Sequence, residues 1–285
     1  MAMPMLEGDS PLSPEEWERL RATVVGVARR ALVARRFVDL YGPLGAGVQT
    51  VAYDEYSGVT SGALDLVGEQ DEAPVFTDVR RFRTIPLLYK DFRLHWRDVE
   101  AARSHNLPLE VSAAAGAAAL CARREDELIF HGDQKLGING LMNEPGRLSS
   151  PLTDWQTPGN GFANVVDATE RLQRAGHFGP YAMAVSPRLF AMLHRVYERT
   201  GVLEIETLRQ LVVGGVHQSS VLQGEAAVVV SIGAENLDLA VALDMTVAYL
   251  GPEKMNHPFR VLEALLPRIK HPDALCTLER GAVPA

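Results

Sequence analysis

The 285-residue chain has few of the residues that build disulfide frameworks, and its charge does not favour nucleic acid. Its two cysteines, Cys121 and Cys276, lie far apart, so we expect no disulfide framework and a reducing, cytoplasmic location. Acidic side chains (36) outnumber basic ones (28), and the net charge of −8 argues against a general nucleic-acid partner. The first residues lack the basic and apolar regions of a signal peptide, and no apolar run predicts a membrane span.

Recognisable catalytic and metal-binding motifs are also missing. The eight histidines form no H-E-x-x-H motif and none pairs with a cysteine at zinc spacing. There is no phosphate-binding G-x-x-x-x-G-K-[ST] loop and no G-x-S-x-G motif, and the glycines of Tyr41–Gly47 have the wrong order for a dinucleotide site. The adjacent carboxylates of Glu125–Glu127 would point in different directions on a helix, so we expect a solvated or intersubunit-paired face and no metal. The residues therefore predict no catalytic site and no resident cofactor.

The most regular stretch is Leu107–Asp133, which predicts one long helix. Its middle consists almost entirely of Ala and Gly, which lets another backbone approach closely, and Gly132 is suited to end it. A membrane span is the alternative, but the charge-free part from Val111 to Ala122 is too short. We therefore expect a packed structural helix, the spine helix.

The N-terminal part predicts a capped helix followed by a protruding ribbon. Ser13, Pro14 and Glu16 together form a helix start with a capping box. The helix that follows is amphipathic, and arginines occupy the surface opposite its apolar face. It is either an ordinary helix with a solvated basic face or a helix that binds a partner. Val48–Tyr56 and Ala73–Leu88 predict two extended arms, and an isolated ribbon of this kind is marginally stable without a surface to cover it. This indicates obligate assembly.

After a Pro/Gly-rich boundary from Asn143 to Gly161, helices and strands alternate. The expected helices are Phe162–Gln173, Arg188–Glu198 and Ile205–Val213. The expected strands are Tyr181–Val185, Ala226–Ile232, Leu237–Leu250 and Phe259–Ile269, with Pro267 marking an edge or a bulge in the last. The chain thus predicts an α+β protein.

Several of these motifs resemble those of the shell proteins of encapsulin nanocompartments (family one), which are similar in turn to tailed-phage major capsid proteins. The motifs are P-x-x-x-E-E-W at the first helix, LYGPLGAG (40–47), KDFRLHWRDVE (90–100), EDELIFHGD (125–133), HFGPY (177–181), TGVLEIET (200–207) and the segment 255–278. The likeness runs nearly end to end. Within the family it is greatest to the iron-storing shells of myxobacteria.

The resemblance implies the α+β fold of tailed-phage capsid proteins (Hong Kong phage type). Residues 1–47 would form the N-terminal arm and helix of a peripheral (P) domain, and 48–88 the extended E-loop. Residues 89–136 would continue the P domain with the spine helix, 137–233 would form the axial (A) domain, and 234–285 would return to the P domain.

The resemblance also implies a function. Copies of the chain would assemble into a closed icosahedral shell, itself non-catalytic, around cargo enzymes that carry C-terminal targeting peptides. Ferritin-like iron-oxidising proteins and peroxidases would be the cargo. The groove for the targeting peptide would comprise polar anchors and apolar lining at Leu32, Arg35, Asp39, Leu237, Asp238 and Leu239.

Two further sites follow from the resemblance. Glu204 and Glu206 would lie near a pore where A-domain tips converge, and a ring of carboxylates there would favour the entry of cations. Trp96 is a candidate flavin contact by likeness to some relatives, whereas a lone Trp is more often a core or interface anchor.

Two alternatives to an encapsulin shell remain at this point. The first is a phage or prophage capsid subunit, which often begins with a long helical scaffolding segment that we do not see before Ser13. The second is a cytosolic enzyme whose site is hidden from sequence, and particle mass would separate it from either shell.

Overall fold

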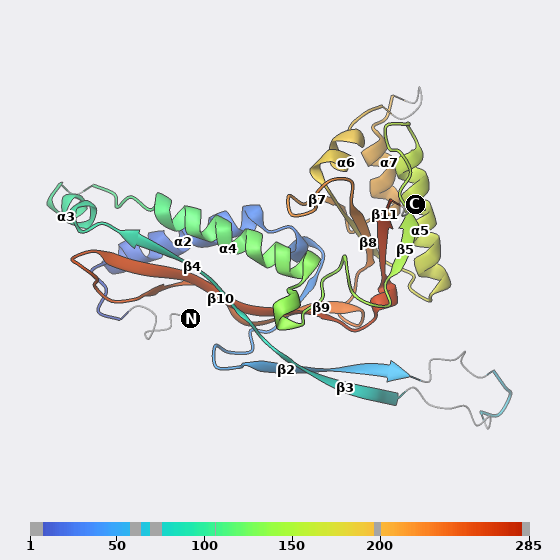
Figure 1. Cartoon of the computed structure of the whole chain (residues 1–285), viewed down its shortest axis with the longest axis horizontal. Coiled ribbons are helices and arrows are strands. Elements are labelled where there is room, and N and C mark those ends of the chain that lie inside the picture. Colours follow the sequence, from blue (N-terminus) through green and yellow to red (C-terminus); the bar gives the residue numbers. More distant parts are fainter. Residues whose placement is uncertain (1–7, 58–63, 69–75, 106, 197–200, 281–285) are drawn as a thin grey trace.

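The computed structural model describes residues 8–57, 64–68, 76–105, 107–196 and 201–280. Two sheets, each with helices packed against it, lie side by side, and a two-stranded ribbon extends away from both (Figure 1). We use the names P domain, A domain and E-loop ribbon for these three parts.

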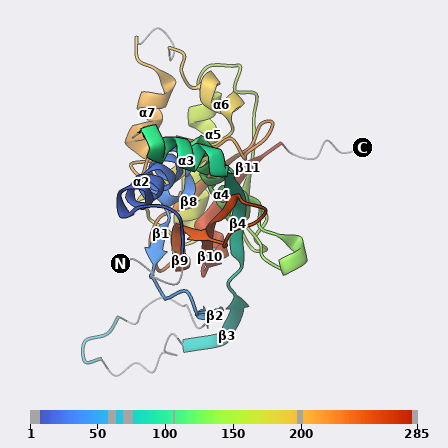
Figure 2. The same cartoon turned by 90° about the vertical axis from the view of Figure 1, so that its left-hand side faces the viewer.

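The P domain is a four-stranded sheet in the order β1-β9-β10-β4, with two long helices packed on one face (Figures 1 and 2). Its strands are β1 (Asp39–Tyr41), β9 (Leu237–Tyr249), β10 (His257–Ile269) and β4 (Leu87–Leu94). β1 is parallel to β9, and the other pairs are antiparallel. β10 pairs with β4 only up to Ala264, so Pro267 lies where no hydrogen bond to β4 is lost.

The two long helices are α2 (Pro14–Ala31) and α4 (Ser112–His131), and the short α3 (Trp96–His105) and η1 (Ala34–Arg36) flank them. The capping box of α2 is confirmed: the Glu16 N–H donates to Ser13 Oγ at 3.2 Å, and the Ser13 N–H donates to Glu16 Oε2 at 2.7 Å. α4 is the expected spine helix, but it begins at Ser112, so Pro108 lies outside its first turn.

The Ala-rich stretch of α4 packs as expected. Its buried face holds Ala114, Ala117, Ala118, Cys121 and Ala122, in one core with the apolar face of α2 and the sheet. The short side chains allow α2 to lie close along α4, and Trp17 of α2 reaches Phe259 of β10 with ring centroids 5.7 Å apart.

The A domain is a five-stranded sheet in the order β5-β11-β8-β6-β7, with helices packed around it (Figure 1). Its strands are β5 (Leu148–Pro151), β11 (Leu275–Glu279), β8 (Ala227–Ser231), β6 (Tyr181–Val185) and β7 (Val216–Gln218). Its helices are α5 (Asn160–Arg174), α6 (Pro187–Met192) and α7 (Glu204–Leu211), and the 3₁₀ turns η2 (Gln134–Leu136) and η3 (Pro272–Ala274) lie in the connections. The helix expected at Arg188–Glu198 is shorter, ending at Met192.

The position of β11 differs from the expected domain boundary. β11 hydrogen-bonds between β5 and β8, so residues 275–279 belong to the A-domain sheet. The return to the P domain therefore ends before Leu275. The chain crosses three times between the sheets, before β5, after β8 and after β10. A shared core that includes Leu128, Phe130, Val228 and Leu265 joins them.

The E-loop ribbon consists of β2 (Thr50–Ser57) paired with β3 (Phe76–Thr84). Val51 and Ile85 at its base are buried in the shared core, whereas Phe82 is 72% exposed. The ribbon projects away from both domains (Figure 1), so most of its length has no core of its own chain to cover it. Among the helices that the structure describes, none is both long and apolar enough to cross a bilayer.

Two glycines of the spine helix should respond oppositely to substitution by alanine. A Cβ at Gly132 (φ +69°) would collide with the Ile138 carbonyl oxygen, whereas a Cβ at Gly116 meets nothing within 4 Å. We expect Gly132→Ala to lower the free energy of unfolding by about 3 kcal/mol or more. Gly116→Ala should raise it by about 0.5–1 kcal/mol, as expected in a helix interior.

Denaturant unfolding monitored by circular dichroism measures both effects. Equal stability of the two variants would contradict the close packing of the turn after α4.

Candidate functional site

The segments of the expected groove meet where α2 ends. Leu32 forms the C-cap of α2, Arg35 lies on η1, and Asp39 begins β1. β1 pairs with β9 in the register Asp39 to Asp238 and Leu40 to Leu239. The structure thus brings together two regions that are about 200 residues apart in sequence.

Most of the residues expected to form the groove are not exposed at this junction. Leu32, Leu237, Asp238 and Leu239 are all buried within the subunit. The exposed residues are those of β1, namely Asp39, Leu40 and Tyr41. Solvent therefore reaches β1 directly, whereas its partner residues on β9 pair with it within the sheet and are buried.

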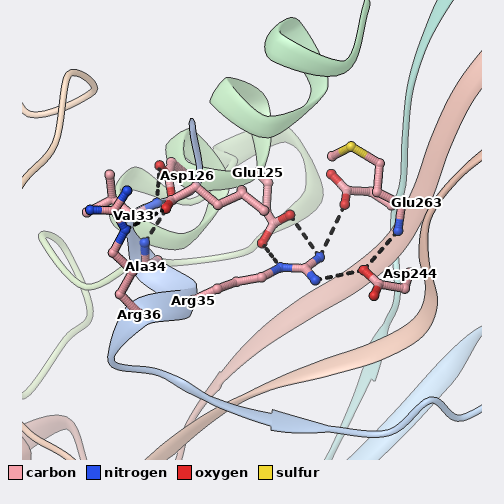
Figure 3. Close-up of polar contacts among 10 residues, drawn as sticks. Val33, Ala34, Arg35, Arg36, Glu125, Asp126, Asp244 and Glu263 are labelled. Carbon is pink, nitrogen blue, oxygen red and sulfur yellow. Dashed lines mark hydrogen bonds and ion pairs between the residues drawn. The ribbon is translucent and has the colours of Figure 1, made fainter. Parts of the chain in front are cut away.

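The Arg35 side chain is directed into the protein and binds three carboxylates (Figure 3). Its Nε and Nη2 donate to Glu125 Oε1 and Oε2 at 2.6 and 2.9 Å, in a bidentate pair. Nη2 also donates to Glu263 Oε2 at 3.3 Å, and Nη1 donates to Asp244 Oδ1 at 2.7 Å. One guanidinium therefore links η1 to α4, β9 and β10.

The neighbouring Asp126 binds the backbone of the same segment (Figure 3). The Val33 N–H donates to its Oδ2 at 3.0 Å, and the Ala34 N–H donates to its Oδ1 at 3.0 Å. These two N–H groups have left the hydrogen-bond ladder of α2, so Asp126 replaces their helical partners. Burial raises the pKa of Asp126 to about 6, and the two N–H donors oppose that rise.

The carboxylates around Arg35 repel one another at close range. Burial and then the charge of Glu125 raise the pKa of Glu263 well above its ordinary value. Burial alone would lower the pKa of Arg35, but its hydrogen bonds to Glu125 and Asp244 outweigh this and raise it. The raised pKa of Glu263 favours its neutral form in this cluster, and Glu125 and Asp244 make the shorter contacts to Arg35.

These contacts correct our expectation for Glu125–Glu127. Glu125 and Asp126 are fully or almost fully buried and paired within the subunit, not solvated or held for a neighbour. Only Glu127 turns outward, where Arg123 and Arg124 pair with it at 3.0 and 3.3 Å. A sequence signal did exist: Glu263 is a lone charge within the apolar run VLEALL of β10, which a buried partner would explain.

Asp238 belongs to a second buried cluster. Arg268 binds it through Nε and Nη2, both at 2.6 Å, and Lys270 Nζ lies 2.8 Å away. The Arg268 guanidinium also lies 4.0 Å from the ring centroid of Tyr41 on β1. Asp238 therefore holds Arg268 in place against Tyr41 of β1, and its carboxylate is buried.

The two glutamates expected near a pore differ in exposure. Glu204 is buried, with its Oε1 accepting from the Phe162 N–H at 3.2 Å and Arg195 3.6 Å from its Oε2. That burial removes Glu204 as a pore-lining candidate. Glu206 lies on the surface of α7 and pairs with Arg209 at 2.5 Å, so its pore role stays a prediction.

The two buried clusters each combine carboxylate and cationic side chains. Within the described ranges, no three His, Cys, Asp or Glu side chains gather as metal ligands. Cys121 and Cys276 are buried, and burial raises the pKa of each thiol to about 12. The contacts at the end of α2 hold η1 against α4, β9 and β10, and they leave β1 as an exposed edge strand.

Comparison with known proteins identifies what the chain is similar to. Residues 3–266 match the Linocin_M18 family, described as "Encapsulating protein for peroxidase". The chain is 67% identical over 271 residues to the type 1 encapsulin shell protein EncA of Myxococcus xanthus (strain DK1622), covering 95% of this chain and 94% of that protein.

Two solved structures share the fold at low identity. A virus-like particle from Pyrococcus furiosus has a TM-score of 0.76 at 23% identity, covering 93% of this chain and 100% of that chain. The capsid of Myoviridae phage XM1 has a TM-score of 0.65 at 11% identity, covering 87% and 91%. The expected phage-capsid fold is thereby confirmed.

The carboxylates at Arg35 predict a specific dependence of stability on pH. The folded-state pKa of Glu263 is raised, so the folded chain binds more protons than the unfolded chain, and stability is lost as pH rises through that pKa. Glu263→Gln keeps the shape without the charge. It should therefore stabilise the protein at pH 8 relative to wild type and change little at pH 5.

Glu125→Gln is the matched control, because it removes the bidentate partner of Arg35. It should cost about 3 kcal/mol at pH 8. Thermal unfolding of the two variants and wild type at both pH values measures the difference. An equal loss of stability from both substitutions at pH 8 would contradict a protonated Glu263.

Proposed function

The chain belongs to the encapsulin family of encapsulating shell proteins, and on that basis we propose that its copies assemble into a closed icosahedral shell around cargo proteins. The observation that carries the proposal is the E-loop ribbon, which extends away from both domains (Figure 1). A two-stranded ribbon is marginal alone, so neighbouring subunits would provide its cover. A phage capsid subunit shares the fold, but the family match favours the cargo-enclosing shell.

The exposed apolar side chains of the ribbon support assembly. Leu64, Leu66 and Val67 near its far end are each more than three-quarters exposed. Monomeric proteins rarely expose such groups together, and stable obligate interfaces bury about 2,000 Å² or more. Association would remove this surface from water and offset the cost of ordering the ribbon.

We place the cargo groove at β1. The exposed Asp39, Leu40 and Tyr41 combine a charge with apolar area, beside the buried Leu32, Leu237 and Leu239. A short targeting peptide with basic and apolar residues would find complementary groups there. Arg35 contributes by holding η1 in place, because its guanidinium is already occupied by carboxylates.

The shell itself would be a wall with no catalytic role, and its cargo would supply the chemistry. A peroxidase is the cargo that the family description names, and a ferritin-like iron-storage protein is the other candidate. Such a shell would work in the cytoplasm. Cations would enter through pores near Glu206.

A flavin contact at Trp96 stays a prediction. The indole is half-buried, and His95 and the Arg97 guanidinium lie 6.2 and 5.6 Å from its ring centroid. A flavin stacked on this indole would compete with these neighbours for the ring.

Deleting residues 53–75 should abolish particles without unfolding the subunit. Val51 and Ile85, through which the ribbon joins the shared core, lie outside the deletion. Negative-stain imaging and light scattering should show megadalton shells for wild type and only small species for the deletion. Circular dichroism should report retained helix content, and normal shells from the deleted chain would refute the role of the ribbon.

Loading of cargo should depend on the β1 surface. Asp39→Lys with Leu40→Ser should leave shells intact and reduce capture of a fluorescent protein bearing the targeting peptide by about tenfold or more. The matched control is Asp98→Lys on α3, another exposed carboxylate. The ratio of fluorescence to shell protein in purified particles measures capture, and full loading of the β1 variant would disprove the groove assignment. Arg35→Ala is unsuitable here, because it would strand Glu125 and Glu263 in the interior.

A further inference from the structure

A large pocket lies at the base of the E-loop ribbon, beside two of the connections between the P and A domains. Its volume is about 790 Å³, which is in the range of sites that bind small organic molecules. The ribbon forms one wall, and three other segments form the rest. The lining includes Tyr53, Arg81, Arg83, Glu144–Gly146, Ala175–His177 and Lys270–Asp273. We call it the root pocket.

The arginines of β3 divide between the two faces of the ribbon. Arg80, Arg81 and Arg83 follow closely in sequence, and side chains alternate along a strand. Arg81 and Arg83 therefore share the face that lines the root pocket, and Arg80 lies on the other face. Arg80 is opposite Asp54 of β2 and binds it through Nε and Nη2 at 2.7 and 3.0 Å. The register of the ribbon thus gives Arg80 a carboxylate partner.

Uncharged side chains lie opposite the two arginines of the root pocket. Arg81 pairs in register with Tyr53, and Arg83 pairs with Val51. Among the residues that the structure describes, the Arg83 guanidinium makes a single hydrogen bond, from Nη1 to the Gly137 carbonyl oxygen at 3.4 Å. A guanidinium carries five N–H donors and makes its strongest contacts with carboxylate and phosphate oxygens. Arg83 therefore retains donors that a bound anion can use.

The cations on the opposite wall of the root pocket already have carboxylate neighbours. Lys270 Nζ lies 2.8 Å from Oδ2 of the buried Asp238, and His177 Nε2 lies 3.1 Å from Asp273 Oδ1. Glu144 adds a further carboxylate to this wall. The root pocket is therefore positive at β3 and neutral to acidic on the other side. A ligand that suits it has an anionic end and hydrogen-bond donors at the other end.

We propose that the root pocket binds the phosphate group of a small molecule at Arg81 and Arg83. A phosphate presents several oxygens in the geometry that the guanidinium fork matches, and two arginines on one face of a strand can contact it together. The volume leaves room for further atoms, whose hydroxyl groups would face Glu144 and Asp273. Inorganic phosphate and a phosphorylated metabolite share this chemistry. One subunit supplies the whole pocket, so the inference does not depend on the proposed shell.

Titration calorimetry of the purified full-length protein tests the proposal, with inorganic phosphate and adenosine monophosphate as probes at the same ionic strength. We expect binding with a dissociation constant of about 1 mM or tighter. Tighter binding of adenosine monophosphate would identify a phosphorylated metabolite as the ligand. Equal or tighter binding of inorganic phosphate would identify the ion itself. Failure of both probes to bind would overturn the proposal.

Three single variants locate the binding. Arg83→Gln should weaken it about tenfold or more, because a charge-assisted contact to phosphate is lost. Arg81→Gln should act in the same direction, and its exposed position makes it independent of the packing at the base of the ribbon. Arg80→Gln is the matched control on the other face and should keep the affinity of wild type. Circular dichroism checks that each variant is folded.

Two results with folded variants would contradict the site. One is wild-type affinity in both Arg81→Gln and Arg83→Gln. The other is a loss in Arg80→Gln as large as that in Arg83→Gln, which would mean that the charge of the whole ribbon, and not the root pocket, attracts the probe.

Discussion

Glu125 and Asp126, two neighbouring carboxylates on the spine helix, hold the N-terminal segment against the rest of the subunit. Glu125 binds the Arg35 side chain and Asp126 binds the backbone N–H groups just before it. Because α4 also packs on the sheet, this pair fixes where α2 ends and where β1 begins. The position of β1 as an edge strand, and hence the surface that we assign to cargo, depends on these contacts.

Burying the charged side chains around Arg35 costs free energy, which is offset only while all of their mutual contacts are made. Removing charges from water carries a large penalty, which close pairing and full hydrogen bonding have to offset. Arg35 binds Glu125 and Asp244, and the raised pKa of Glu263 lets that carboxyl stay neutral nearby. Breaking such a cluster by removing one partner is strongly destabilising, because it leaves an uncompensated buried charge.

The E-loop ribbon, unlike the buried cluster at Arg35, is mostly exposed in the single subunit. Its base is anchored in the shared core through Val51 and Ile85. The side chains of Phe82, Leu64, Leu66 and Val67 are exposed to solvent. The P and A domains each have a hydrophobic core cluster of their own, in addition to the core that they share. In the proposed shell the ribbon would gain its stability from neighbouring subunits, so its order would depend on assembly.

The sequence by itself determined the local elements and the family. The capping box at Ser13, the Ala-rich face of α4 and the strand Tyr181–Val185 follow from short-range propensities and periodicity, and the structure agrees with them. Only the tertiary structure decided that Glu125 and Asp126 are buried, that Glu204 faces inward, and that β11 joins the A-domain sheet. The reason is physical: burial and strand pairing depend on partners such as Arg35, Arg195 and β8 that are distant in sequence, and a local pattern carries no record of which distant segment will pack against it.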